Sequence, residues 1–194
     1  MILVAVALVG VLTVPLVGGR LSLLSGLRLH ALWAVWVATA LQLAITQGGS
    51  SVPSGLARTL HVASYVLSAW CIWSNRRLPG LWLVAVGGGL NLLAIATNGG
   101  SMPATEWAWR TSGLDVVAAG QFENSSISSG SRLWFFGDVF AVPRGWPFAN
   151  VFSVGDVIIV AGLLVLVHRT CRPLQTSLSA TPAATHDDPL HAVA

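Results

Sequence analysis

The sequence predicts an all-α membrane protein with about five transmembrane helices. Of its 194 residues, 54% are hydrophobic and only 9% are charged, and its mean hydropathy is +0.73. A helix that crosses a bilayer needs roughly 17 to 25 mostly apolar residues. Five stretches approach or meet this requirement, and they cover residues 2–17, 31–46, 60–74, 81–97 and 151–168.

The first stretch predicts a retained helix because no basic residue precedes it and it ends in LVGGR, without a small-residue cleavage site. Arginines collect in the cytoplasmic loops of membrane proteins. Here they follow the first, third and fifth stretches, whereas the second loop has only Arg58. This pattern places the N-terminus outside and the C-terminus in the cytoplasm.

The segment between the fourth and fifth stretches is long and rich in tryptophan. It covers residues 98–150 and contains Trp107, Trp109, Trp134 and Trp146, which predict a loop lying on the outer membrane surface. Its FENSSISSGS stretch predicts a flexible excursion. The expected organisation is therefore a five-span domain over residues 1–172 with this outer loop, and a disordered cytoplasmic tail over residues 173–194.

The composition argues against several classes of function. A net charge of +3, spread over the loops, is no footprint for nucleic acid. Cys71 and Cys171 form no CxxC motif and no cluster with histidine, so neither a disulfide scaffold nor a metal site is expected. No cofactor is indicated, because a haem would need facing histidines inside the helices.

Two aspartates lie in surroundings so apolar that a functional role is expected. An ionised Asp at the centre of a membrane helix costs about 2.5 to 3.5 kcal/mol, and such acids are functional candidates by default. Asp138 and Asp156 are joined by a segment that could fold back and bring them together. A close pair would share a proton and could act as an aspartic dyad. Alternatively, Asp156 pairs with Arg58 or His61 as a structural ion pair, and Asp138 caps a turn.

Polar residues on the helices supply candidate substrate-binding groups. His61 belongs to a stripe repeated at three- and four-residue steps, and Asn91 and Asn98 lie on nearly one face of the fourth stretch. Packing between helices explains most such residues. We nevertheless take Asn91, Asn98, Arg58 and His61 as candidates beside the two acids.

The C-terminal half resembles the lipoprotein signal peptidases. Phe152-Ser153-Val154-Gly155-Asp156 is similar to the F-N-x-A-D pattern of that family, Phe136 to Phe140 to its V-x-D-F segment, and Gly88 to Leu92 to its G-N-L segment. The resemblance implies that Asp138 and Asp156 are a catalytic pair. Ser153 stands where that family has asparagine.

Over most of its length the chain resembles a family of five-span bacterial membrane proteins known as a domain of unknown function. The shared motifs are Gly18-Gly19-Arg20, the N-G-G-x-M-P run from Asn98 to Pro103, and Gly155-Asp156. This resemblance implies a multi-pass protein of the bacterial cell membrane and no established activity.

Two functions follow as alternatives. The first is binding of membrane lipids, or of a lipid-anchored or membrane-protein partner, through the outer face. The second is a membrane-embedded aspartic hydrolase that uses Asp138 and Asp156. A transporter fits less well, because the chain has no repeat that could support alternating access.

Overall fold

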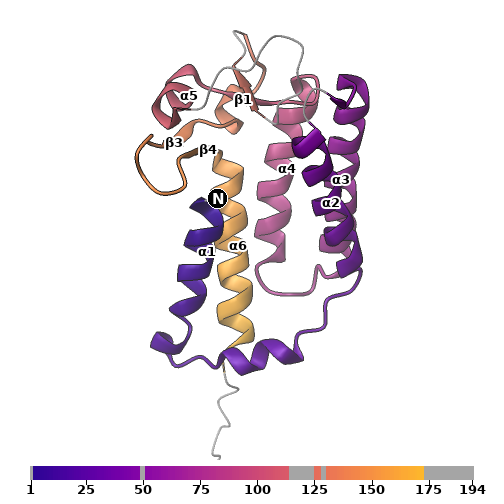
Figure 1. Cartoon of the computed structure of the whole chain (residues 1–194). Helices are drawn as coiled ribbons and strands as arrows, with labels where there is room; N and C mark the ends of the chain where they lie inside the picture. Colours follow the sequence, from indigo (N-terminus) through magenta and orange to yellow (C-terminus); the bar gives the residue numbers. More distant parts are fainter. Residues whose placement is uncertain (1, 49–50, 114–124, 128–129, 173–194) are drawn as a thin grey trace, which may run out of the picture.

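The computed structural model describes residues 2–48, 51–113, 125–127 and 130–172 (Figure 1). The α-helices in these residues are α1 (Ile2–Leu12), α2 (Leu32–Gly48), α3 (Ser54–Ser74), α4 (Leu81–Thr97), α5 (Glu106–Ser112) and α6 (Val154–Thr170). The 3-10 helices are η1 (Pro15–Val17), η2 (Leu21–Gly26) and η4 (Trp134–Phe136), and the strands are β1 (Met102–Ala104), β2 (Ser125–Ile127), β3 (Phe140–Val142) and β4 (Asn150–Phe152).

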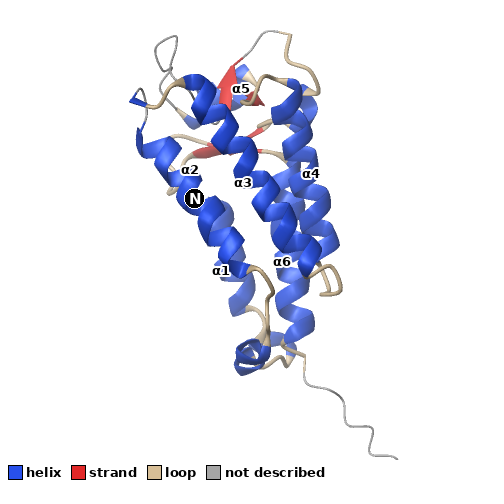
Figure 2. Ribbon diagram, turned by 90° about the vertical axis from the view of Figure 1, so that its right-hand side faces the viewer, coloured by secondary structure: helices blue, strands red, loops and turns tan. Residues whose placement is uncertain are grey.

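The long helices run side by side and carry the strands at one end of the bundle (Figures 1 and 2). We call this the strand end, and the opposite end, which carries η1 and η2, the η2 end. α2 and α3 form an antiparallel hairpin, α4 lies antiparallel to α6, and α1 packs along α6. The helices lie close to the predicted stretches, and α4 has the predicted bounds.

The prediction of five transmembrane helices is nevertheless wrong. No helix in the described part of the chain is both long enough and apolar enough to cross a bilayer. α2, α4 and α6 contain 17 residues each, which is roughly 25 Å of helix against a hydrocarbon core of about 30 Å. α1 has 11 residues, and α3, with 21, carries an arginine, a histidine and several serines. The predicted orientation, with the N-terminus outside and the C-terminus in the cytoplasm, was based on these spans and loses its basis.

Glycines bring α4 and α6 into close contact. Gly80, just before α4, faces Gly162 of α6. Gly87, in the middle of α4, faces Gly155 of α6. The two glycines on each helix are seven residues, or about two turns, apart. A Cβ on Gly162 would lie 2.8 Å from the Gly80 carbonyl oxygen, and one on Gly87 would overlap the Gly155 carbonyl. Larger residues at these positions would force the two backbones apart.

The segment predicted as an outer loop, residues 98–150, contains regular structure, so the chain is not purely α-helical. β1 pairs in parallel with β2, and β3 pairs antiparallel with β4, where the Phe140 and Phe152 rings stack with centroids 5.3 Å apart. The Thr105 side chain caps α5 by accepting a hydrogen bond from the Ala108 amide. The tail over residues 173–194 and half of FENSSISSGS lie outside the described residues.

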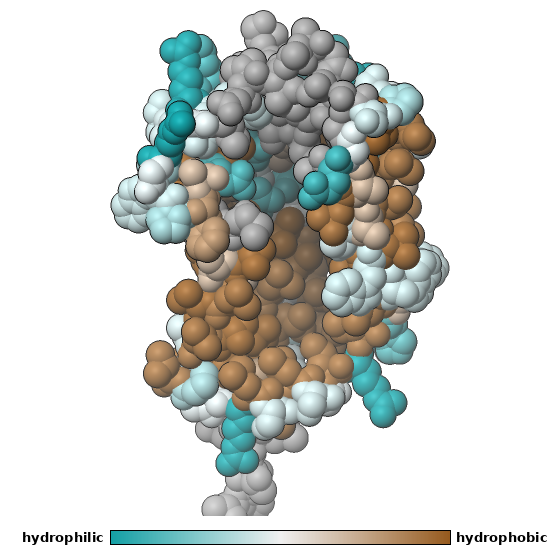
Figure 3. Space-filling model, viewed as in Figure 1, coloured by the Kyte–Doolittle hydropathy of each residue, from teal (hydrophilic) through white to brown (hydrophobic). Residues whose placement is uncertain are grey.

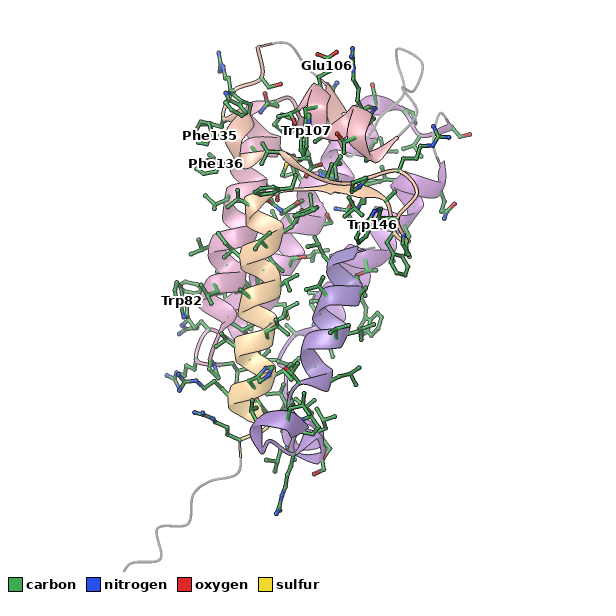
Figure 4. The ribbon with its side chains drawn as sticks, turned by 90° about the vertical axis from the view of Figure 1, so that its left-hand side faces the viewer. Trp82, Glu106, Trp107, Phe135, Phe136 and Trp146 are labelled. Carbon is green, nitrogen blue, oxygen red and sulfur yellow. The ribbon has the colours of Figure 1, made fainter. Side chains whose placement is uncertain are left out.

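Much of the surface along the helices is apolar. Figure 3 shows hydrophobic side chains over the middle of one face and hydrophilic side chains toward both ends. In Figure 4, Trp82, Phe135 and Trp146 project outward, and they are 64%, 48% and 70% exposed.

Candidate functional site

A cavity of about 280 Å³ lies at the strand end and gathers residues from distant parts of the chain. Its walls combine two acids, two amides, an imidazole and a phenol with two apolar side chains. They are Gln42 of α2, His61 and Tyr65 of α3, Asn91 and Ile95 of α4, Met102 of β1, Asp138, and Asp156 of α6. Four of the six candidates predicted from the sequence therefore line one cavity: Asp138, Asp156, Asn91 and His61.

Asp156 is held at the start of α6 by a reciprocal cap. The Ser153 hydroxyl accepts a hydrogen bond from the Asp156 amide at 3.0 Å, and Oδ2 of Asp156 accepts one from the Ser153 amide at 3.0 Å. Such a capping box satisfies two amides that the helix leaves without partners, and a negative charge there complements the helix dipole. The predicted ion pair with Arg58 is therefore not what holds this acid in place.

Asn91 ties this cap to the neighbouring helix. Its Nδ2 donates to Oδ1 of Asp156 at 2.8 Å, and its Oδ1 accepts from the Ser153 hydroxyl at 2.8 Å. Gly155 lies against the same amide, and a Cβ there would overlap Oδ1 of Asn91. Asn91, Ser153 and Asp156 thus form a polar joint between α4 and α6 within an otherwise apolar interface.

Asp138 reaches the cavity from the backbone that precedes β3. Its amide donates to the Pro103 carbonyl at 2.8 Å, and its own carbonyl accepts from the Thr105 amide at 3.1 Å. Gly137 packs so closely on Pro103 that a Cβ would overlap the Pro103 carbonyl. Fixed by these contacts, Asp138 is only 5% exposed.

His61 and Tyr65 form the α3 wall of the cavity. Their rings meet edge to face with centroids 5.5 Å apart. Burial lowers the pKa of His61, which favours a neutral imidazole. Burial raises the pKa of Tyr65, and the charges of Asp156 and Asp138 raise it further, so the phenol keeps its proton.

The other two predicted residues, Asn98 and Arg58, have different surroundings. Asn98 ends α4, where its Nδ2 donates to the Ala94 and Arg132 carbonyls and its Oδ1 accepts from the Arg132 amide. The Arg58 side chain packs beside Gly100. Neither residue lines the cavity.

The end of α3 repeats the arrangement seen at Asn98. Asn75 donates from Nδ2 to the Cys71 and His30 carbonyls and accepts at Oδ1 from the His30 amide. Both asparagines bind a carbonyl four residues earlier and both backbone groups of one distant residue. Asn98 is therefore explained as a cap that holds a loop.

Sequence reasoning did not select Gln42 and Tyr65 as site residues. Tyr65 was visible as a member of the polar stripe of α3, four residues after His61. Gln42 lies on α2, and its Nε2 donates to the Ser64 hydroxyl of α3 at 2.7 Å. Only this packing of α2 on α3 brings Gln42 to the cavity.

Three apolar grooves adjoin the cavity, and one of them, about 360 Å³ between α3 and α4, shares only Tyr65 with it. The central groove, about 530 Å³, lies between α2, α3, α4 and α6 and shares Gln42 and Tyr65 with the cavity. Figure 3 shows a recess with hydrophobic walls and hydrophilic side chains at its upper end. The α1–α6 groove, about 430 Å³, is apolar except for Asp156, which it also shares with the cavity.

The described residues contain no group of three or more His, Cys, Asp or Glu side chains that could hold a metal ion. The acids, amides, imidazole and phenol that line the cavity can form hydrogen bonds and transfer protons.

Comparisons with known proteins identify a family whose function is unknown. Residues 26–168 match the model of a family of unknown function, DUF5317. A protein of Thermotoga maritima described as uncharacterized is 31% identical over 100 residues, which make up 52% of this chain and 56% of that protein. The chain thus spans about half the length of this curated relative. No solved structure matches.

Proposed function

We propose that this chain, which belongs to the DUF5317 family of unknown function, binds an amphipathic molecule with a single aliphatic chain. The aliphatic chain would occupy the central groove and the polar end would enter the cavity. The observation that carries this proposal is the junction of the two hollows at Gln42 and Tyr65.

The dimensions and lining of the hollows support this assignment. Ligand pockets are typically about 300 to 1,000 Å³, mostly apolar, with a few polar groups that fix orientation. At about 530 and 280 Å³, the groove and the cavity together fall in this range. The groove is walled largely by aliphatic side chains, such as Leu32, Val35 and Leu163, which suit a hydrocarbon chain.

The charge of the cavity indicates which polar end it accepts. Asp138 and Asp156 offer carboxylate oxygens, and no arginine is among the lining residues. An anionic head would meet like charge, whereas hydroxyl or ammonium groups would donate hydrogen bonds to these oxygens. The proposed ligand is therefore a hydroxylated or cationic amphiphile. The apolar outer surface supports lipid as its source.

Native mass spectrometry of the purified full chain tests this proposal with three ligands of equal chain length, namely dodecanol, dodecylamine and dodecanoate. We expect dodecanol and dodecylamine to bind about tenfold more tightly than dodecanoate, a difference of about 1.4 kcal/mol. Asp138→Asn should reduce this preference. Equal binding of all three ligands would reject the assignment of the polar end.

Two adjacent glycines provide a matched pair for the groove. A Cβ on Gly88 or Gly89 meets no atom within 4 Å, but only Gly88 lines the central groove. Gly88→Leu should therefore abolish binding of all three ligands, whereas Gly89→Leu should leave it unchanged. Binding that survives Gly88→Leu would show that the chain does not enter this groove.

A second function, aspartic hydrolysis of a lipid-modified substrate, is favoured by one observation: both acids line the same cavity. An ionised carboxylate would take a proton from water as it attacks a carbonyl, while the protonated acid polarises that carbonyl.

A quenched peptide carrying a diacylglyceryl-modified cysteine tests this second function. Asp138→Asn should abolish its cleavage while dodecanol still binds. Glu106→Gln removes an exposed acid at the same end of the molecule and should leave cleavage unchanged. If the unaltered protein does not cleave the peptide, hydrolysis of this substrate class is rejected and the binding function stands.

A further inference from the structure

Four arginines line a separate hollow at the η2 end, far from the acidic cavity. The hollow has a volume of about 660 Å³ and is lined by Arg20, Arg28, Arg169 and Arg172, all of them exposed. The first two flank η2, and the other two come from the end of α6. Residues separated by more than half of the chain thus present guanidinium groups to one space.

The two segments that carry these arginines are tied together by the backbone. The Arg20 amide donates to the Cys171 carbonyl at 2.8 Å, which joins the two segments. Within the first segment, the Gly19 amide donates to the Val14 carbonyl at 3.0 Å. Val14 and Cys171 are completely buried. The arginines therefore project from a fixed framework, which lowers the entropy cost of assembling them around a ligand.

No acid of the described residues neutralises this cluster. The three described acids, Glu106, Asp138 and Asp156, belong to the strand end, and the ion pair seen in the described part of the chain joins Glu106 to Arg110. Four like charges in one hollow repel each other, and a bound anion would relieve this repulsion.

The helix dipole explains only part of this arrangement. Arg169 lies in the last turn of α6, where a cation is favourable next to the negative end of the dipole. Arg20 and Arg28 belong to another segment and are not explained in this way. Because they lie opposite the end of α6, the hollow is lined by arginines from both segments.

We propose that this hollow binds a phosphate group. Guanidinium groups match phosphate oxygens through paired N–H donors, and several of them can surround one phosphate. The rest of the wall includes Leu23, Leu27 and Leu78, which favour a phospholipid over a fully soluble phosphate. This site is separate from the amphiphile cavity and does not depend on it.

The test compares phosphatidylglycerol with phosphatidylcholine of the same acyl chains, added to the full chain in dodecyl maltoside and followed by native mass spectrometry. Phosphatidylglycerol should bind about tenfold more tightly. Arg20→Gln combined with Arg28→Gln should remove this preference. Arg169→Gln combined with Arg172→Gln should do the same, which guards against a fold defect in one pair.

Arg76 and Arg77 give the matched control, because they follow α3, which ends at the η2 end (Figure 1), and neither of them lines the hollow. Replacing both by glutamine changes the net charge equally and should keep the preference. Loss of the preference in this control would overturn the proposal. Pyrophosphate is tested as a soluble ligand in the same experiment. If the unaltered protein neither prefers phosphatidylglycerol nor binds pyrophosphate, the proposal is also overturned. Pyrophosphate binding that depends on Arg20 and Arg28, without preference for phosphatidylglycerol, would keep the phosphate site and assign it to a soluble ligand.

Discussion

Asn91 donates a hydrogen bond from Nδ2 to Oδ1 of Asp156 over 2.8 Å, and this contact links α4 to the first turn of α6. It explains why an acid is retained beside a long apolar helix. The carboxylate accepts one hydrogen bond from α4 and another from the Ser153 amide, so it closes the cap and joins two helices at once. Asp156 therefore has a structural role whether or not it also meets a ligand.

The cap predicts a measurable loss of stability. Ser153→Ala and Asp156→Ala should each lower the free energy of unfolding by about 1 to 2 kcal/mol. The double variant should lose less than the sum, because both single changes break the same box. Denaturant unfolding gives these values. Thr59→Ala removes an exposed hydroxyl that bonds within its own helix and should change stability by less than about 0.5 kcal/mol. A cap variant as harmless as this control would contradict the assignment.

The contact of α4 with α6 predicts opposite effects at two glycines. Gly155→Ala should destabilise by about 1 to 3 kcal/mol, because its Cβ overlaps Oδ1 of Asn91 and lies 2.6 Å from the Gly87 carbonyl oxygen. Gly89→Ala should stabilise α4 by up to about 1 kcal/mol, because its Cβ enters open space. Thermal unfolding of both variants distinguishes them. Similar shifts at both positions would mean that the helices are not in close contact.

The buried imidazole predicts a pH-dependent stability. Because burial lowers the pKa of His61 below its ordinary 6.5, the unfolded chain takes up a proton first as the pH falls. The contribution of His61 to stability is therefore complete at neutral pH and decreases below about pH 6.5. Asp138, Asp156 and Tyr65 face the same cavity as His61.

His61→Gln should flatten the decrease in melting temperature between pH 7 and pH 5. His30→Gln removes an exposed imidazole in the same chain and provides the comparison. An unchanged pH slope in His61→Gln would show that this imidazole is not desolvated in the folded protein.

The positions of the helices could be predicted from the sequence, whereas the prediction that they cross a membrane was wrong. The apolar run located α4 at its observed bounds, because Gly80 and Asn98, which flank this run, are the residues that cap the helix. It failed for membrane crossing because apolar windows extend past helix ends, as at residues 2–17, where α1 stops at Leu12 and continues as η1. The strands have three residues each, too few to produce a readable alternation.

For the candidate site, residue chemistry identified Asp138, Asp156, Asn91 and His61, and the structure brings these four to one cavity. Asn98 does not line the cavity, because its side chain binds the backbone of Arg132, which lies 34 residues away in sequence. The capping box could have been predicted, since Ser153 precedes Asp156 by three residues at the start of an apolar run.

Asp156 borders the cavity on one side and the α1–α6 groove on the other. Ligands in these two spaces would therefore share one carboxylate. Depending on their charge, each would raise or lower the affinity of the other. By thermodynamic linkage, the affinity measured in either space would depend on what fills the other, and by the same factor in both directions.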